Sequence, residues 1–150
     1  MDHLLRTLRP QEYYLLEDFL YEAIFQPDQT CLAPRSIIDK PELQVYIKNF
    51  GAQPDDHALC VECGGQVVGA AWVRNILGYG SIDHSTPELA ISLYKEYRGQ
   101  GLGSALLRAL LEKLRQAGYP RVSLAVQKAN YALKLYLRAG FTIIDENSQE

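Results

Sequence analysis

Apolar residues recur along the chain with two different periods. Alternation at every second position predicts strands, and a spacing of three or four residues predicts amphipathic helices. Strands are expected in this way at residues 4–9, 57–62, 66–74, 88–94, 122–126 and 141–145, and helices at 10–24, 34–50, 102–114 and 130–140. The expected order of elements is β, α, α, β, β, β, α, β, α, β, with no internal repeat.

Residues 88–114 form the longest continuous pattern, in which a strand leads through a short turn into a helix. A glycine-rich segment opens this helix, with the sequence Gly99-Gln100-Gly101-Leu102-Gly103. The first turn of a helix carries N–H groups without intrahelical partners and the positive end of the helix dipole. Glycines let a ligand approach that backbone closely, and Arg98 adds a charge at the entrance, so the segment suits a polyphosphate. A strand-to-helix turn that binds nothing is the simpler alternative.

Two common phosphate motifs do not match this segment. A P-loop requires Lys and then Ser or Thr after its last glycine, whereas Gly103 is followed by Ser104. A dinucleotide fingerprint requires a third small residue, at the position of Leu106 if the pattern begins at Gly101 or of Ser104 if it begins at Gly99. It should also open a βαβ unit. Neither alignment fits well. The pattern that matches is Arg-x-x-Gly-x-Gly, formed by Arg98, Gly101 and Gly103 between a strand and an amphipathic helix.

Composition restricts the classes of partner. Of the 150 residues, 47% are hydrophobic and 22% are charged, which is typical of a globular domain. The formal charge is -3 and the basic residues are scattered, which argues against a nucleic-acid partner. The N-terminus does not resemble a secretory signal, and no segment approaches the roughly 18 apolar residues that span a bilayer. Three cysteines cannot all pair within one chain, so we expect a cytoplasmic protein without a membrane partner.

Two closely spaced cysteines, Cys60 and Cys63, lie in a predicted hairpin whose turn is Gly64-Gly65. The Cys-x-x-Cys-Gly sequence resembles half of a zinc knuckle. A structural zinc site usually needs a second pair of ligands, and only Cys31 and distant histidines remain to supply one. Residues three apart on a strand also point to opposite faces, so we expect no metal here.

A second motif occupies residues 129–141, with the sequence ANYALKLYLRAGF. Asn130 lies near the start of a predicted helix, Tyr136 lies within it, and Gly140-Phe141 follows. Gly140 suits a helix C-terminus because glycine readily adopts positive φ. Taken alone, Asn130 is explained as a helix cap and Tyr136 as an amphipathic core residue.

Together the two motifs resemble the GNAT superfamily of acetyl-CoA-dependent N-acetyltransferases. The resemblance covers nearly the whole chain in element order and is specific at two segments, residues 98–103 and 129–141. It implies an α/β fold in one domain over residues 1–150, with a central mixed, mostly antiparallel sheet flanked by helices. The family usually has one strand after the sixth, and here the sequence ends at Glu150. Asn130 departs from the commonest family spacing, since it lies six rather than seven residues before Tyr136.

The resemblance also implies a site for acetyl-CoA. In the family, the strand equivalent to 88–94 splays from the strand equivalent to 122–126, and unpaired main-chain groups in the gap bind the pantetheine. Amides at the start of the following helix bind the pyrophosphate. The implied cofactor-binding residues are Ile91, Ser92, Leu93, Arg98, Gly99, Gln100, Gly101, Leu102, Gly103, Ser104, Asn130 and Tyr136.

The implied chemistry is direct attack of an amine on the thioester, with a main-chain N–H of the central strand holding the oxyanion. Tyr136 would donate a proton to the departing thiolate. The amine must lose a proton, and Glu88, at the start of the central strand, matches the position of the base in some members. A solvated carboxylate at a strand end is the alternative for Glu88. Asp83 and His84 are rival bases on the preceding loop.

We therefore expect an acyltransferase that acetylates a primary amine, with an acceptor cleft built from the first two helices and the loop before Glu88. The acceptor is a small molecule or a peptide, and the small net charge does not select among a cationic amine, an amino-sugar and a peptide N-terminus. Both a monomer and a homodimer are compatible with the sequence. The alternatives are a non-catalytic acyl-CoA-binding domain, regulatory or part of a complex, and a binder of nucleotide phosphates.

Overall fold

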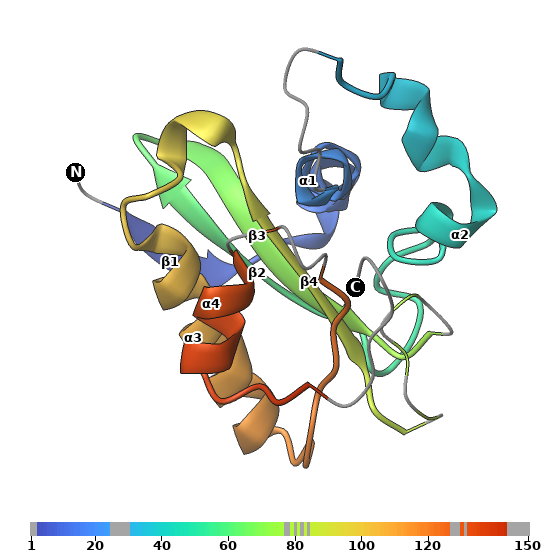
Figure 1. Cartoon of the computed structure of the whole chain (residues 1–150), viewed down its shortest axis with the longest axis vertical. Helices are drawn as coiled ribbons and strands as arrows, with labels where there is room; N and C mark the ends of the chain where they lie inside the picture. Colours follow the sequence, from blue (N-terminus) through green and yellow to red (C-terminus); the bar gives the residue numbers. More distant parts are fainter. Residues whose placement is uncertain are drawn as a thin grey trace.

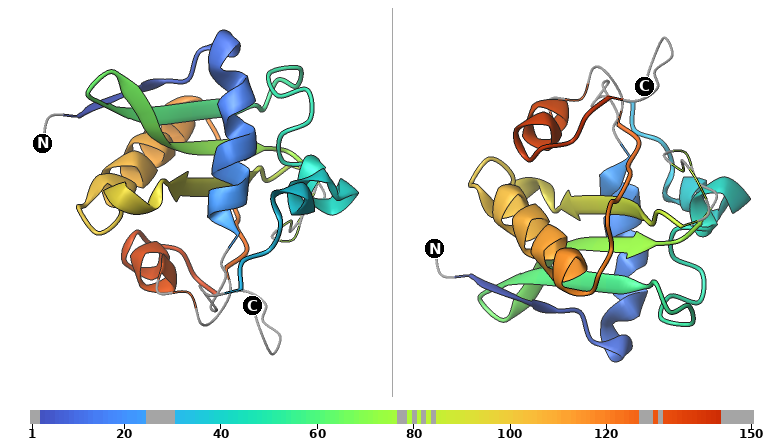
Figure 2. Two further views of the ribbon diagram at one scale, coloured as in Figure 1. Left: turned by 90° about the horizontal axis from the view of Figure 1, so that it is seen from above. Right: turned by 90° about the horizontal axis from the view of Figure 1, so that it is seen from below.

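The computed structural model describes residues 3–24, 31–76, 79, 81, 83, 85–126, 130 and 132–143. Antiparallel strands form one sheet in the order β1-β2-β3-β4, namely β1 (Leu4–Thr7), β2 (His57–Cys63), β3 (Gln66–Arg74) and β4 (Glu88–Leu93). Helices cover both faces, with α1 (Leu16–Ala23) on one and α3 (Leu102–Gln116) on the other (Figure 1 and Figure 2). Shorter helices complete the chain: η1 (Pro10–Leu15), η2 (Arg35–Asp39), α2 (Pro41–Gln44), η3 (Lys95–Tyr97) and α4 (Ala132–Arg138), of which α4 lies beyond the β4 edge of the sheet (Figure 2).

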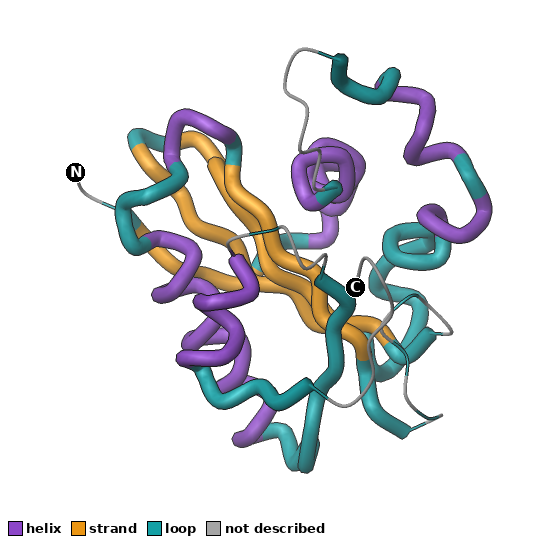
Figure 3. Tube along the Cα trace, viewed as in Figure 1, coloured by secondary structure: helices purple, strands orange, loops and turns teal. Residues whose placement is uncertain are grey.

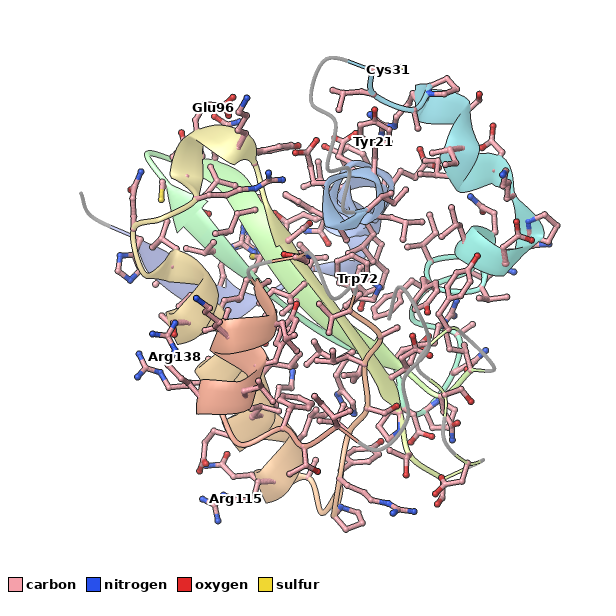
Figure 4. All side chains as sticks on the ribbon, viewed as in Figure 1. Tyr21, Cys31, Trp72, Glu96, Arg115 and Arg138 are labelled. Carbon is pink, nitrogen blue, oxygen red and sulfur yellow. The ribbon has the colours of Figure 1, made fainter. Side chains whose placement is uncertain are left out.

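Alternation along the strands divides the core into two clusters, one on each face of the sheet. The cluster under α3 contains apolar residues of β2, β3 and β4 together with Leu102, Leu106, Leu107, Leu110 and Leu114. The cluster under α1 contains Ala58, Cys60, Ala70 and Trp72 from the sheet and Leu16, Phe19 and Leu20 from the helix. Figure 4 labels Trp72, which is 1% exposed on the α1 side. The predicted apolar faces of the first and third helices are thereby confirmed.

The predicted hairpin is also confirmed. β2 and β3 pair on either side of Gly64 and Gly65, which have φ values of +58° and +81°. Both signs are those that a two-residue hairpin turn of this kind requires. Cys60 and Cys63 lie in opposite core clusters, as expected for residues three apart on a strand.

Among the described residues, no group of three or more His, Cys, Asp or Glu side chains is arranged to hold a metal ion. No helix in the same ranges is both long enough and apolar enough to cross a membrane. Cys31 is an exposed free thiol at the periphery (Figure 4).

The predicted strand at 122–126 does not form. Ser123 makes a single parallel bridge to Glu88, and the chain then runs beside β4 as a loop (Figure 3). Val122 and Leu124 still pack against the α3 cluster, which explains the apolar alternation in this segment. Alternation reports the burial of side chains, and here it is not accompanied by pairing of the backbone.

The predicted last strand is not present over the described residues 141–143, and 144–145 lie outside the described ranges. Phe141 cannot start a ladder because its N–H donates to the carbonyl of Tyr136 at 3.1 Å and closes the end of α4. Gly140 supports this closure with φ of +106°. The first strand is shorter than predicted for a related reason. It ends at Thr7, and the Arg9 N–H donates to Glu12 Oε1 at 2.9 Å to begin η1.

Leu93 lies between two glycines that should respond oppositely to alanine. A Cβ on Gly69 would lie 2.1 Å from Leu93 Cδ2, whereas a Cβ on Gly103 would lie 3.7 Å from Leu93 Cδ1. We expect Gly69→Ala to lower the free energy of unfolding by about 1–3 kcal/mol through overpacking. Gly103→Ala should raise it by about 0.5–1 kcal/mol, because alanine is the better helix former. Urea unfolding of both variants measures the two changes, and changes of the same sign would contradict this packing.

Candidate active site

A cavity of about 400 Å³ opens between β4 and residues 124–126, the two segments that diverge after Ser123. The end of α1 and residues 37–46 supply its remaining walls together with the region of α4. The first two helices, which were expected to form the acceptor cleft, therefore contribute residues to this cavity. Four predicted site residues line it, namely Glu88, Ile91, Asn130 and Tyr136.

Main-chain N–H and C=O groups of β4 point alternately toward β3 and toward the opposite side of the strand. Tyr94 N–H donates to Val68 O at 2.9 Å on the β3 side, whereas Leu89 N–H donates to Ser123 O at 2.7 Å on the other side. Because main-chain groups alternate along a strand, Ile91 and Leu93 direct their N–H and C=O groups toward the side of Ser123. Within the described ranges, no main-chain acceptor meets these two N–H groups. The edge that the resemblance assigns to pantetheine is therefore open at these two N–H groups, whereas the Leu93 carbonyl accepts from Arg98 Nε.

Ser92 is placed differently from its neighbours. Its main chain pairs with Ala70 on β3, and its hydroxyl donates to Phe19 O at 2.6 Å on the α1 face. The geometry therefore gives Ser92 a structural contact to α1 and does not bring its polar groups to the open edge.

The start of α3 has the conformation expected of an anion-binding turn. Gly101, the N-cap, has φ of +83°, and Gly99 has φ of +75°. A Cβ on either glycine would meet no atom within 4 Å, so the space above them is open. No described side chain caps α3, which leaves the N–H groups of Leu102, Gly103 and Ser104 available to a ligand.

The side chains around this turn point elsewhere. Arg98 Nε donates to Leu93 O at 3.1 Å, and its Nη2 pairs with Glu22 Oε1 at 3.1 Å. Gln100 donates its side-chain amide to Glu96 O at 3.2 Å. The groups available to a phosphate at this turn are therefore main-chain amides. A phosphate would have to compete with Glu22 for the Arg98 guanidinium.

Glu88 is 2% exposed, so the alternative of a solvated strand-end carboxylate is wrong. Its Oε2 accepts a hydrogen bond from the hydroxyl of Tyr46. Tyr46 follows α2 and is 7% exposed. Its hydroxyl contacts a carboxylate that lines the cavity, and the weak helical pattern around Tyr46 gave no signal of a partner at Glu88. The pKa of Tyr46 is raised above its ordinary value. Burial is the largest cause, and the nearby charge of Glu88 is the second.

Asp83, one of the rival bases, is not among the described residues that line the cavity. The carboxylate of Asp83 accepts hydrogen bonds from the N–H groups of Ser85 at 2.9 Å and Thr86 at 2.8 Å and pairs with Arg121. The Ser85 main chain, followed by Thr86, lowers the pKa of Asp83 to about 2. A carboxylate so stabilised is a weak base. His84 lies outside the described residues.

Tyr136 enters the cavity from α4 on the side of the open edge. Its ring packs edge-on against Phe141 with centroids 5.9 Å apart. Burial raises the pKa of Tyr136 to about 12, so the phenol keeps its proton at neutral pH. Asn130 Oδ1 accepts from Ala132 N–H at 2.9 Å, so Asn130 caps the helix that carries Tyr136 and also lines the cavity.

The sequence can be compared with known families now that this geometry is established. The family model described as the acetyltransferase (GNAT) family matches residues 12–141, and the chain belongs to this family. A mycothiol acetyltransferase from Pseudarthrobacter chlorophenolicus is 33% identical over 106 residues, which are 70% of this chain and 33% of that protein. The chain spans a third or less of the length of the curated relatives it matches.

Solved structures share the fold. The PaiA N-acetyltransferase from Thermoplasma acidophilum in complex with coenzyme A has a TM-score of 0.69 at 18% identity, with 99% of this chain and 94% of that chain covered. A GNAT family acetyltransferase from Brucella melitensis in complex with acetyl-CoA has a TM-score of 0.62 at 25% identity, with 95% and 84% covered. The predicted α/β fold, with a mostly antiparallel sheet flanked by helices, is thereby confirmed.

Proposed function

We propose that this chain transfers an acetyl group from acetyl-CoA to a primary amine by direct attack in a ternary complex. The observation that carries the proposal is the cavity in which the open edge of β4 meets Glu88 on one wall and Tyr136 on another. Support comes from relatives named as mycothiol acetyltransferases and from structural neighbours in complex with coenzyme A and acetyl-CoA.

The described residues fit acetyl-CoA at both ends of the open edge. The main chain of Ile91 and the N–H of Leu93 would pair with the pantetheine amides, as an added strand would, while the Leu93 carbonyl accepts from Arg98 Nε. The amides of residues 99–104 would hold the pyrophosphate at the positive end of α3. Asn130 lines the same cavity and would bound the channel that holds the cofactor.

Glu88 and Tyr136 would carry out the two proton transfers of the reaction. The attacking amine would lose its proton to Glu88, directly or through water, because a protonated amine has no lone pair for attack. A new N–C bond forms to the acetyl carbon while the C–S bond breaks. The sulfur leaves with the electron pair and takes the proton that Tyr136 carries at neutral pH. An N–H of the open edge would stabilise the oxyanion formed between these steps.

The proposed acceptor is a primary amine on a small molecule. Apolar side chains of α1 and of the segment before Tyr46 line one side of the cavity, among them Leu20, Ile24 and Leu43. Lys40 and Glu42 line it as well and are exposed. Buried Glu88 supplies a negative charge for a cationic amine at the bottom of this side.

Gly101 tests the pyrophosphate turn. Gly101→Ala would place a side chain in the open space above the turn and strain a residue with φ of +83°, so we expect affinity for coenzyme A to fall about tenfold. Isothermal titration calorimetry measures this. Gly64→Ala is the matched control, because Gly64 also has positive φ and open space but lies in the β2–β3 turn. Equal affinities for the two variants would contradict the assignment.

Tyr136 tests the chemical step. We expect Tyr136→Phe to lower kcat on the order of 100-fold, because the leaving thiolate loses its proton donor, while affinity for acetyl-CoA stays within about twofold. Release of the CoA thiol with a panel of primary amines measures the rate. Tyr14→Phe, at a 71% exposed tyrosine, should behave as the native chain does. Binding of acetyl-CoA without amine-dependent thiol release in the native chain would instead favour a non-catalytic binding domain.

A further inference from the structure

We infer that Tyr46 is a positioning residue for the transfer reaction, and that its hydroxyl holds the Glu88 carboxylate in the orientation that receives the proton of the amine. The inference rests on the proposed function, in which Glu88 is the base. Tyr46 and Glu88 both line the cavity, and they come from segments 42 residues apart.

The direction of the hydrogen bond is fixed by the groups around the phenol. The Tyr79 N–H donates to the Tyr46 hydroxyl oxygen at 3.0 Å, and a main-chain N–H can only donate. The single proton of the hydroxyl is therefore directed to Glu88 Oε2, the partner with acceptor capacity. Burial reinforces this arrangement, because it keeps the phenol protonated. When Glu88 is ionised, as a base must be, this contact is a charge-assisted hydrogen bond, which is the stronger class.

The main chain of Tyr46 is fixed as firmly as its hydroxyl. Trp72 Nε1 donates to Tyr46 O at 3.1 Å from the centre of β3. Arg74, also on β3, donates to Lys48 O at 2.6 Å and pairs with Asp56 at 3.0 Å, with both charged side chains almost fully buried. The turn that carries Tyr46 is therefore bound to the rigid part of the sheet on both sides of this residue.

Glu88 needs such a support because of its own position. It is the first residue of β4 and forms the bridge with Ser123, after which the two segments diverge. Its side chain points to the α1 face, where α1 and the segment after α2 are the neighbours. A glutamate has three side-chain torsions, so an anchor at one oxygen restricts where the other can meet an amine. General-base catalysis depends on that distance and direction.

A double-mutant cycle tests the inference with CoA thiol release from the full chain. We expect Tyr46→Phe to lower kcat about tenfold and to leave KM for acetyl-CoA within about twofold. In a Glu88→Gln background, the same substitution should change kcat by less than about twofold, because there is no longer a base to orient. A structural role of the hydroxyl would instead lower kcat equally in both backgrounds.

Tyr119→Phe is the matched control. The Tyr119 hydroxyl also donates to a carboxylate, that of Asp55, but neither residue lines the cavity. We expect the two Phe variants to lose similar thermal stability and only Tyr46→Phe to lose kcat, which separates positioning from folding.

Two results would overturn the inference alone: a Tyr46→Phe variant with native kcat, or equal losses in both backgrounds. A Glu88→Gln variant as active as the native chain would overturn the inference together with the base that the proposed function assigns. Failure of the native chain to acetylate any amine would remove the proposed function together with the inference. The two failures are therefore distinguishable.

Discussion

The structure depends on the bridge between Glu88 and Ser123, where β4 loses its neighbour. The Leu89 N–H donates to Ser123 O, and the Ser123 N–H donates to Pro87 O, so the two segments are bound at one point. Beyond it they separate around a cavity that Ile91 lines, and the N–H groups of Ile91 and Leu93 turn to the side that Ser123 no longer covers. Main-chain groups at such an edge can pair with water or with a ligand, so the edge suits a ligand that has amides of its own.

The rest of the fold holds β4 in place although one of its edges is unpaired beyond the bridge. The antiparallel ladder from β1 to β4 and the two core clusters stabilise β4 from one side and from both faces. Strand alternation then decides which groups reach the cavity. Glu88 turns its side chain to the α1 face, while Leu89 and Leu93 anchor the strand against α3. One strand thus supplies a buried carboxylate, an open main-chain edge and a core contact without conflict among them.

Sequence alone could predict the elements whose stability comes from periodic burial. The helical spacing around Phe19 and Leu106, and the glycine pair of the hairpin, specify local structure and one buried face. The open edge was implied only by the family resemblance. Periodicity by itself predicted a full strand around Ser123, because side-chain burial and backbone pairing leave the same pattern in a sequence.

Contacts between distant residues were beyond reach for a different reason. Arg98 pairs with Glu22, and Tyr46 with Glu88, across separations that no local pattern encodes. The burial of Glu88 follows from the second of these contacts, so sequence left open whether it was solvated. The residues that hold the site were therefore less predictable than the residues on the motifs.

Amide hydrogen exchange along β4 tests the central claim most directly. Ala90 and Ser92 turn their N–H groups to β3, whereas Ile91 and Leu93 turn theirs to the open edge, so one strand contains its own control. Saturating coenzyme A should slow exchange at Ile91 and Leu93 by at least about tenfold and change Ala90 and Ser92 much less. Coenzyme A that binds without slowing exchange at Ile91 and Leu93 would contradict the account.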